Sequence, residues 1–193
     1  SGANACVLHH LENDATCGDG EMLLMDVAAR YANYNSDLTR TIPVNGRFSD
    51  RQRAVYNAVL RTMRACSEML RPGVILKDYQ EEVGKLIQSE LIGLELITKK
   101  DIEGQDPDKP AYKKYFMHGT SHHLGLDVHD LGDTWRAVEV GMVFTIEPGI
   151  YIPEENLGCR LENNYVIGKD GNVDLMATIP VESEDIEDLM NAG

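Results

Sequence analysis

The segment Met117–Asp130 contains four of the six histidines in the chain, and histidine chemistry is the first thing the sequence offers. The four are His118, His122, His123 and His129. Histidine is the commonest side-chain metal ligand and the residue that most readily transfers protons near neutral pH. The segment is therefore a metal site, an acid–base site, or a polar loop that happens to be rich in histidine. The carboxylates elsewhere in the chain decide between these alternatives.

Two aspartates lie in consecutive segments that we expect to pair as an antiparallel hairpin. The segments, Glu21–Tyr31 and Tyr34–Val44, combine apolar and β-branched residues as strands do. A turn centred near Tyr31-Ala32 would place Asp26 directly opposite Asp37, with Cβ atoms ~5 Å apart. An unpaired carboxylate buried in an apolar strand costs several kcal/mol. Two that face each other therefore favour a bound cation between them.

Two glutamates repeat this arrangement nearer the C-terminus. Glu147 ends the predicted strand Met142–Glu147, and Glu162 lies in the predicted strand Arg160–Ile167. Antiparallel pairing of the two glutamates has its midpoint at Glu154-Glu155, within a connection that contains proline and glycine. The second pair of strands therefore also predicts two facing carboxylates.

Each of the four carboxylates also has an explanation that needs no metal. These explanations are an ion pair with Arg30 or Arg40 for Asp26, a turn for Asp37, a helix start or a turn for Glu147, and an ion pair with Arg160 for Glu162. Four carboxylates and one neutral histidine nevertheless form an oxygen-rich ligand set that suits Mn²⁺, Co²⁺, Fe²⁺ or Zn²⁺. Four negative charges balance two divalent cations, and such a pair activates a water and polarises a carbonyl or phosphoryl oxygen.

Two amphipathic helices are expected to cover part of the sheet that carries these residues. The first begins at Ser49, where Gln52 completes a capping box, and ends at Arg71-Pro72-Gly73. The second covers about Lys77–Leu94. The remaining predicted elements are a strand at Ala5–His10, a loop at Lys99–Lys114, a strand at Val173–Ile179 and a helix at Ser183–Met190 capped by Ser183. This order predicts an α+β domain with a mainly antiparallel sheet.

Composition limits the class of protein. With 193 residues, of which 42% are hydrophobic, we expect one domain over 1–193 with one buried core. The net charge of −14 argues against nucleic acid or an anionic membrane as a partner. No apolar run has the length of a membrane helix, and no secretory signal pattern is present. The four cysteines form no C-x-x-C pair, so we expect reduced thiols in a cytoplasmic protein.

Taken together, these motifs resemble the catalytic domain of the creatinase/prolidase, or pita-bread, metallopeptidases. The resemblance rests on SDLTRT around Asp37, with Asp26 eleven residues earlier, and on HGTSHHLGLDVHD, TIEPGIY and CRLEN around His122, Glu147 and Glu162. It extends from the first residues to about residue 190 and is strongest to the Xaa-Pro aminopeptidases of the family. It implies the pita-bread fold, a curved and mainly antiparallel sheet with covering helices.

The family pattern also implies a role for each matching residue. It implies metal ligands at Asp26, Asp37, His122, Glu147 and Glu162, of which Asp37 and Glu162 bridge two divalent ions. The pattern favours Mn²⁺, with Co²⁺, Fe²⁺ or Zn²⁺ as alternatives. Glu147 would also handle the proton of the attacking water. The other implied positions are His118 and His129 as catalytic, substrate-contacting residues, His9 as a further substrate residue, and Arg160 and Tyr151 as supports of the ligands.

Two histidines depart from the family pattern. His123 and His10 stand where close relatives often carry bulky residues, and we expect both to pack or to be solvated. Asn163-Asn164 follows Glu162 where an acidic residue is common, so the surroundings of that glutamate are expected to differ.

The implied reaction is hydrolysis of the bond before a proline, which releases the N-terminal residue of a proline-containing peptide. A prolidase that cuts only dipeptides is the alternative within the class. Creatinase-like amidine hydrolysis would keep the fold without the metal ligands. The non-enzymatic alternative is a metal-free pita-bread module that binds peptides. The intact set of five ligand positions favours a metallopeptidase over both metal-free readings.

The resemblance covers only part of a family member. In the family an N-terminal domain and a first helix pair precede the residues matched here, whereas this chain opens at Ser1 without an initiator methionine. We therefore expect a trimmed catalytic piece, with the first helix pair missing, whose uncovered sheet face needs a partner chain, most simply in a homo-oligomer. A clean monomer by light scattering, with no apolar surface detected by dye binding, would contradict this. Whether this piece is active by itself is left open.

Overall fold

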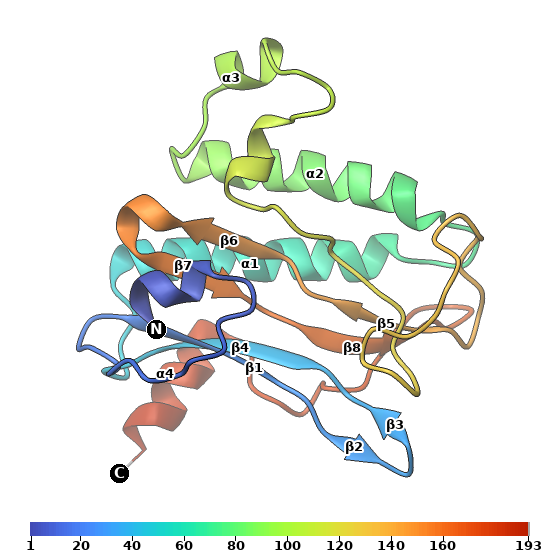
Figure 1. Cartoon of the computed structure of the whole chain (residues 1–193), viewed down its shortest axis with the longest axis horizontal. Helices are drawn as coiled ribbons and strands as arrows, with labels where there is room; N and C mark the ends of the chain where they lie inside the picture. The colour runs from blue at the N-terminus through green and yellow to red at the C-terminus, as the bar shows by residue number, and fades with distance from the viewer. Residues whose placement is uncertain (193) are drawn as a thin grey trace.

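Antiparallel strands form the centre of the structure, and the long helix α1 lies behind them in Figure 1. The computed structural model describes residues 1–192. The strands are β1 (Met22–Val27), β2 (Arg30–Tyr31), β3 (Tyr34–Asn35), β4 (Leu38–Pro43), β5 (Val143–Ile146), β6 (Gly149–Ile152), β7 (Leu157–Arg160), β8 (Asn163–Val166) and β9 (Val173–Asp174). The helices are α1 (Asp50–Met69), α2 (Leu76–Gly93), α3 (Lys99–Glu103) and α4 (Ser183–Asn191), with 3-10 turns η1 (Gly2–Cys6), η2 (Ala111–Lys114) and η3 (Pro153–Glu155). The described strand pairings are all antiparallel, which confirms the predicted α+β class.

The first hairpin pairs with a register two residues away from the predicted one. Asp26 of β1 lies opposite Thr39 of β4, so the prediction that it lies directly opposite Asp37 is wrong. The reason is the turn, which is formed by Ala32 and Asn33 with φ values of 49° and 72°. Positive φ at both central residues is typical of the tight two-residue hairpin turn. Because side chains alternate along a strand, a shift of two residues leaves both aspartates on the same face.

The second carboxylate pair has the predicted register. Ile146 lies opposite Asn163 and Gly149 lies opposite Arg160, so Glu147 and Glu162 occupy facing positions between these pairs. Pro148 lacks an N–H but its carbonyl still accepts from the Leu161 N–H at 3.3 Å. The chain therefore continues past the proline as β6, and β7 begins before the predicted strand start at Arg160.

Two further contacts join the strands into the surface that carries the site. An isolated bridge between Thr39 and Glu162 connects β4 to β8. On the other side, the N–H groups of Thr145 and Glu147 donate to the carbonyls of His122 and Thr120 at 3.0 and 2.8 Å. The histidine segment therefore runs antiparallel beside β5. This arrangement brings residues from four distant parts of the sequence onto adjacent strands.

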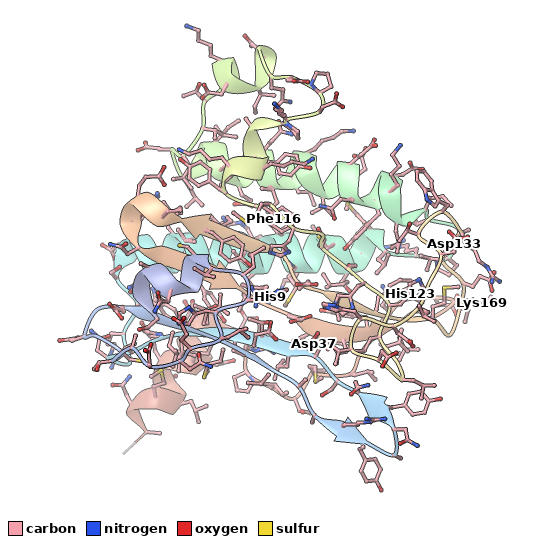
Figure 2. The ribbon with its side chains drawn as sticks, in the orientation of Figure 1. His9, Asp37, Phe116, His123, Asp133 and Lys169 are labelled. Atoms are coloured by element: carbon pink, nitrogen blue, oxygen red, sulfur yellow. The ribbon has the colours of Figure 1, made fainter. Side chains whose placement is uncertain are left out.

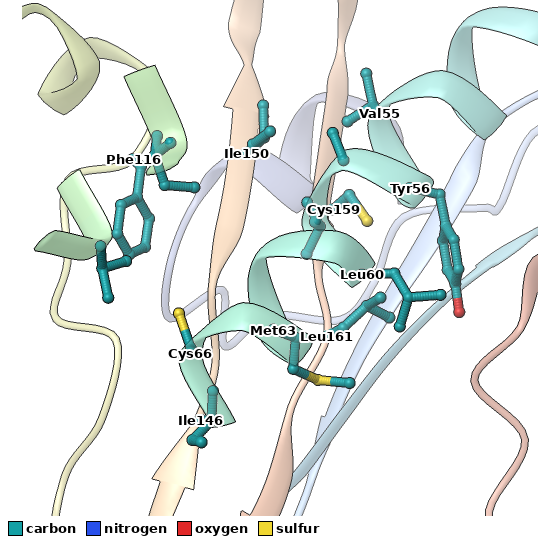
Figure 3. Packing of buried hydrophobic residues seen from close by; sticks show 14 of the residues in the cluster. Val55, Tyr56, Leu60, Met63, Cys66, Phe116, Ile146, Ile150, Cys159 and Leu161 are labelled. Atoms are coloured by element: carbon teal, nitrogen blue, oxygen red, sulfur yellow. The ribbon is translucent and has the colours of Figure 1, made fainter. Parts of the chain in front are cut away.

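The helices agree with their sequence patterns. The capping box of Ser49 and Gln52 at the start of α1 is confirmed, and α2 begins and ends within one residue of the prediction. The apolar face of α1 packs against the strands on either side of the carboxylates. Figure 3 shows Met63 and Cys66 of α1 near Ile146 and Leu161, which belong to the same buried cluster. Burial of these neighbours holds the backbone of Glu147 and Glu162 in place.

Several smaller predictions are wrong. Ala5–His10 is not a strand, because the chain folds as η1 against β7, where the Ala5 carbonyl approaches Gly158 closely. The predicted loop 99–114 contains α3 and η2. Ser183 does not cap α4, because the helix begins at that residue and its hydroxyl bonds Asn57 instead. Within residues 1–192, no helix is both long enough and apolar enough to span a bilayer.

Candidate active site

Nine of the side chains singled out by the sequence line one cavity of about 300 Å³, whereas Tyr151 lies outside its lining. Its lining includes the five predicted ligands Asp26, Asp37, His122, Glu147 and Glu162, together with His9, His118, His129 and Arg160. Figure 2 shows His9 and Asp37 close together near the centre of the molecule. The structure therefore brings together residues that are up to 153 positions apart in the chain.

His122 presents one ring nitrogen to two carboxylates. Its Nδ1 lies 2.9 Å from the His123 carbonyl, and a carbonyl only accepts, so Nδ1 carries a hydrogen. Nε2 then faces Asp37 Oδ2 at 3.6 Å and Glu147 Oε1 at 3.5 Å. Fixing the tautomer through a backbone carbonyl is typical of metal-binding histidines. A neutral His122 ring would therefore present an unprotonated Nε2 toward the carboxylates, as a metal ligand requires.

Without a cation, Glu147, Glu162 and His122 hold their protons to higher pH than the same side chains do in water. Burial and then the charge of Asp37 and Asp26 raise the pKa of Glu147 to about 7, although His122 and Arg160 oppose the shift. Burial, with Glu147 and Asp37 next, raises the pKa of Glu162 to about 8. Burial lowers the pKa of His122, but the facing Asp37 carboxylate, the His123 carbonyl and the charges of Glu147 and Glu162 outweigh it and raise that pKa to about 9. The two glutamate pKa values are thus raised first by burial and then by repulsion between carboxylates, whereas the pKa of His122 is raised by attraction to the same carboxylates.

Arg160 forms an ion pair with a carboxylate of this site. That carboxylate is Asp26 and not Glu162, which was the partner suggested by the sequence. Its guanidinium donates to Asp26 Oδ2 at 2.7 Å and to the Tyr151 hydroxyl at 2.9 Å. Arg30 and Arg40 are therefore not the partners of Asp26, and the Arg160–Glu162 ion pair is also wrong. Because Arg160 neutralises part of the charge, charge balance alone no longer gives the number of metal ions.

His118 is held by the protein at both ring nitrogens. Its Nδ1 lies 2.7 Å from the Gly119 carbonyl and its Nε2 lies 2.8 Å from the Tyr151 hydroxyl. A guanidinium only donates, so the Tyr151 hydroxyl accepts from Arg160 and directs its own hydrogen to His118. Burial lowers the pKa of His118 to about 4, so the ring is neutral at pH 7. A direct hydrogen bond from His118 to a substrate would require one of these two contacts to break.

The remaining histidines differ in their surroundings. The ring of His129 stands edge-on to His122, with centroids 4.5 Å apart, and is exposed. His9 is also exposed at the cavity wall. His123 packs against Phe144 with ring centroids 4.4 Å apart, as expected for a packing residue. His129 and His9 are thus accessible to a bound molecule, whereas His123 is not part of the cavity lining.

Two contacts to the predicted bridging ligands were not anticipated from the sequence. The Asn164 side chain accepts from the Asp37 N–H at 3.0 Å and donates to the Asp37 carbonyl at 2.6 Å. The Thr39 hydroxyl donates to Glu162 Oε2 at 2.7 Å. Strand alternation would have placed Thr39 on the same face as Asp37. The contact between Asn164 and Asp37 could not be predicted in this way, because the two residues lie on different strands.

The residues fit a divalent cation. Ligand atoms of Asp37, His122 and Glu162 all lie within 4.8 Å of one another. Glu162 Oε1 is buried and has no hydrogen-bond partner among the described residues. A buried carboxylate oxygen without a partner is costly, and a cation bound between the carboxylates would remove that cost together with their repulsion.

The shifted pKa values predict how the metal-free protein depends on pH. The folded-state pKa values of Glu147, Glu162 and His122 all lie above their ordinary values, so between pH 6.5 and 9 the folded state binds more protons than the unfolded state. Its stability therefore falls as pH rises through this window. The lowered pKa of His118 makes stability rise with pH, but only below pH 6.5.

We expect the unfolding temperature of chelator-treated protein to fall between pH 6.5 and 9, by about 2–4 °C for each kcal/mol lost. Saturating Mn²⁺ should flatten the dependence, because the cation replaces the protons. Thermal melts with and without chelator measure both curves. A flat or rising curve for the chelated protein would show that the carboxylates are not strained by their burial.

Comparison with known proteins adds evidence independent of this geometry. The family model for metallopeptidase family M24 matches residues 1–169. The chain is 42% identical to the Xaa-Pro aminopeptidase of Haemophilus influenzae and 40% identical to that of Escherichia coli, over 98% and 100% of its own length. It spans 46% of each of these relatives, somewhat less than half.

Solved structures agree with the sequence comparison. Zinc-substituted E. coli aminopeptidase P in complex with product superposes with a TM-score of 0.91 at 38% identity, covering 99% of this chain and 46% of that one. Proline aminopeptidase P II from Yersinia pestis superposes with a TM-score of 0.90 at 38% identity, covering 100% of this chain and 47% of the other. This likeness confirms the predicted pita-bread architecture.

Proposed function

The chain belongs to metallopeptidase family M24, and from that membership and the geometry of the site we propose that it carries the metal-binding centre of an Xaa-Pro aminopeptidase. Such an enzyme removes the N-terminal residue from peptides with proline in the second position. The observation that carries the proposal is the orientation of His122, whose Nε2 faces two carboxylates in a cavity that also holds Asp26 and Glu162. The names of the similar relatives support the choice of substrate.

The proposed ligands are the five predicted side chains, with Asp37 and Glu162 shared between two divalent ions. The carboxylate-rich set favours Mn²⁺, with Co²⁺, Fe²⁺ or Zn²⁺ as alternatives. When bound, the ions would supply Lewis acidity that acidifies the attacking water and polarises the scissile carbonyl. Arg160 and Tyr151 would hold Asp26 and His118 in place through the hydrogen bonds described above.

The protein's own groups would handle protons and position the peptide. Glu147 is the proposed base, because its carboxylate lies in the cavity beside His122 and can take a proton from water. That proton is then available for the proline nitrogen as the carbon–nitrogen bond breaks. His9 and His129, both exposed at the cavity, would donate hydrogen bonds to the substrate. His118 would contribute to binding through the position of its ring, which is fixed by its hydrogen bond with the Tyr151 hydroxyl.

A dipeptide-only prolidase is the second candidate, because the five proposed ligands do not by themselves limit the length of the peptide. A metal-free peptide-binding module is a third candidate, but the buried and unpartnered oxygen of Glu162 argues against it. The same oxygen argues against creatinase-like hydrolysis, which would also leave the site without a metal. Metal content and hydrolysis separate these readings.

The test is an assay of Xaa-Pro-Xaa tripeptide against Xaa-Pro dipeptide, with Mn²⁺ and with chelator, on this chain and on a longer form. We expect Mn²⁺-dependent release of the first residue of the tripeptide. Cleavage of the dipeptide alone would support a prolidase. No bound transition metal and no hydrolysis with Mn²⁺ in either form would reject the enzyme and favour the binding module.

Three broader expectations stay proposals. A single domain over 1–193 agrees with one continuous buried cluster. A homo-oligomer, which light scattering would detect, agrees with exposed apolar side chains such as Val7, Leu11 and Val27. A cytoplasmic location agrees with four cysteines that are free in the structure.

A further inference from the structure

Thr39 is fully buried beside the carboxylate cluster, although it is neither a predicted ligand nor part of the cavity lining. It lies on β4 two residues after Asp37, and therefore on the same face of the strand. Its backbone carbonyl accepts from the Glu162 N–H at 3.1 Å, which forms the isolated bridge between Thr39 of β4 and Glu162, the residue just before β8. The backbone of Glu162 is thus fixed against Thr39 before its side chain is considered.

The direction of the Thr39 hydroxyl follows from its two neighbours. Arg160 Nε lies 3.3 Å from Thr39 Oγ1, and a guanidinium can only donate. The single hydroxyl hydrogen of Thr39 is therefore free to point at Glu162 Oε2, 2.7 Å away. In this way the positive charge of Arg160 polarises the hydroxyl in the sense that strengthens its hydrogen bond to Glu162.

This contact distinguishes the two oxygens of Glu162. Oε2 is occupied by Thr39, whereas Oε1 is buried without any hydrogen-bond partner among residues 1–192. A glutamate side chain has several rotamers, and a single strong hydrogen bond at one oxygen selects among them. The rotamer selected here leaves Oε1 available, and a Glu162 ligand atom lies within 4.8 Å of those of Asp37 and His122.

We propose that Thr39 is a positioning residue for the metal centre, whose hydroxyl holds the Glu162 carboxylate so that Oε1 is free to bind a divalent cation. The inference rests on the proposed function, since the cation is the one proposed there. Thr39 does not touch substrate or cation. Groups that orient a metal ligand typically change metal affinity by about 10–100-fold when they are removed.

The test compares three variants of the full chain by titration calorimetry with Mn²⁺ alone. Thr39→Val removes the hydroxyl without changing the shape of the side chain, and should weaken Mn²⁺ binding by about 10–100-fold. Thr39→Ser keeps the hydroxyl and should bind Mn²⁺ nearly as well as the unmodified protein. Circular dichroism confirms that each metal-free variant is folded.

Thr41→Val is the matched control. Thr41 lies on the same face of β4, is also fully buried, and donates to the Arg160 carbonyl at 2.9 Å rather than to a carboxylate. The Thr41→Val protein should lose a comparable buried hydrogen bond but keep its affinity for Mn²⁺. The contrast between Thr39→Val and Thr41→Val therefore isolates the contact to Glu162 from a general weakening of the strand.

The outcomes separate this inference from the proposed function. If the unmodified chain binds Mn²⁺ and Thr39→Val binds it equally well, the role of Thr39 is overturned and the metal centre stands. Equal losses in Thr39→Ser, or in Thr41→Val, would overturn it as well, because the hydroxyl on Glu162 would not be the cause. If the unmodified chain binds no Mn²⁺, the metal centre itself is rejected, and the role of Thr39 with it.

Discussion

Replacing Asp37 by asparagine should abolish metal binding and hydrolysis while leaving the fold intact. Asparagine has nearly the same shape, and the two hydrogen bonds between residue 37 and the Asn164 side chain involve the backbone of residue 37 rather than its side chain. The change removes one negative charge from the cluster. Because groups that merely support a ligand cost about 10–100-fold in affinity, loss of a shared ligand should exceed that range. Metal content and peptidase activity measure the two effects.

The stability of the metal-free protein gives this experiment a second readout. Asp37 repels the neighbouring carboxylates and contributes to the raised pKa of Glu147 and of Glu162. Metal-free Asp37→Asn should therefore unfold at the same temperature as the unmodified protein or at a higher one, yet gain no stability from Mn²⁺. Asp170→Asn, which removes the same charge from an exposed position, is the control and should behave like the unmodified protein. Metal-dependent peptidase activity in Asp37→Asn would show that the ligand assignment is wrong.

The second large effect is expected for Glu147→Gln. Glutamine keeps the shape and the polarity of the side chain but cannot accept a proton from water. General acid–base groups contribute about 10²–10⁴-fold to rate, so kcat should fall by that amount on an Xaa-Pro-Xaa peptide. Glu147 is also a proposed ligand, so the comparison must be made at Mn²⁺ concentrations that saturate each protein.

Glu139→Gln provides the control for this change. Glu139 is exposed, precedes β5, and pairs with Arg136 on the surface. Surface changes of this kind usually alter the free energy of unfolding by no more than about 0.5 kcal/mol. The kcat of Glu139→Gln should therefore equal that of the unmodified protein. If saturated Glu147→Gln retained a kcat within tenfold of the unmodified enzyme, another group would have to be the base. His118 would be a poor substitute, because both of its ring nitrogens are already used by the protein.

Much of the framework was predictable because it depends on local periodicity. Helix α1 follows from its apolar face and from the capping box at Ser49, both of which are encoded within a few turns. The facing positions of Glu147 and Glu162 follow from antiparallel pairing about a midpoint in a short connection. The same argument misplaced Asp26 by two residues, because the register of a hairpin depends on which residues form the turn.

The cation site illustrates the same division between local and tertiary information. Residue types and spacing indicated a cation among four carboxylates, since carboxylates in apolar strands are costly unless they are paired. The resemblance to a known family implied the fifth ligand, His122. The partner of each carboxylate was not predictable in this way. Asp26 is paired with Arg160, 134 residues away, and Glu162 with Thr39, 123 residues away. Strand alternation gives the face on which a side chain lies, but not the neighbour that it meets on another strand.

The chemical groups, the main strands and helices that carry them, and the family to which they belong are therefore readable from the amino-acid sequence. The tertiary structure decided how those groups are held. It assigned Arg160 to Asp26, turned His122 so that its Nε2 faces the carboxylates, and engaged both nitrogens of His118. The physical reason is that hydrogen bonds between distant segments depend on side-chain direction, which is settled only when the strands pack together.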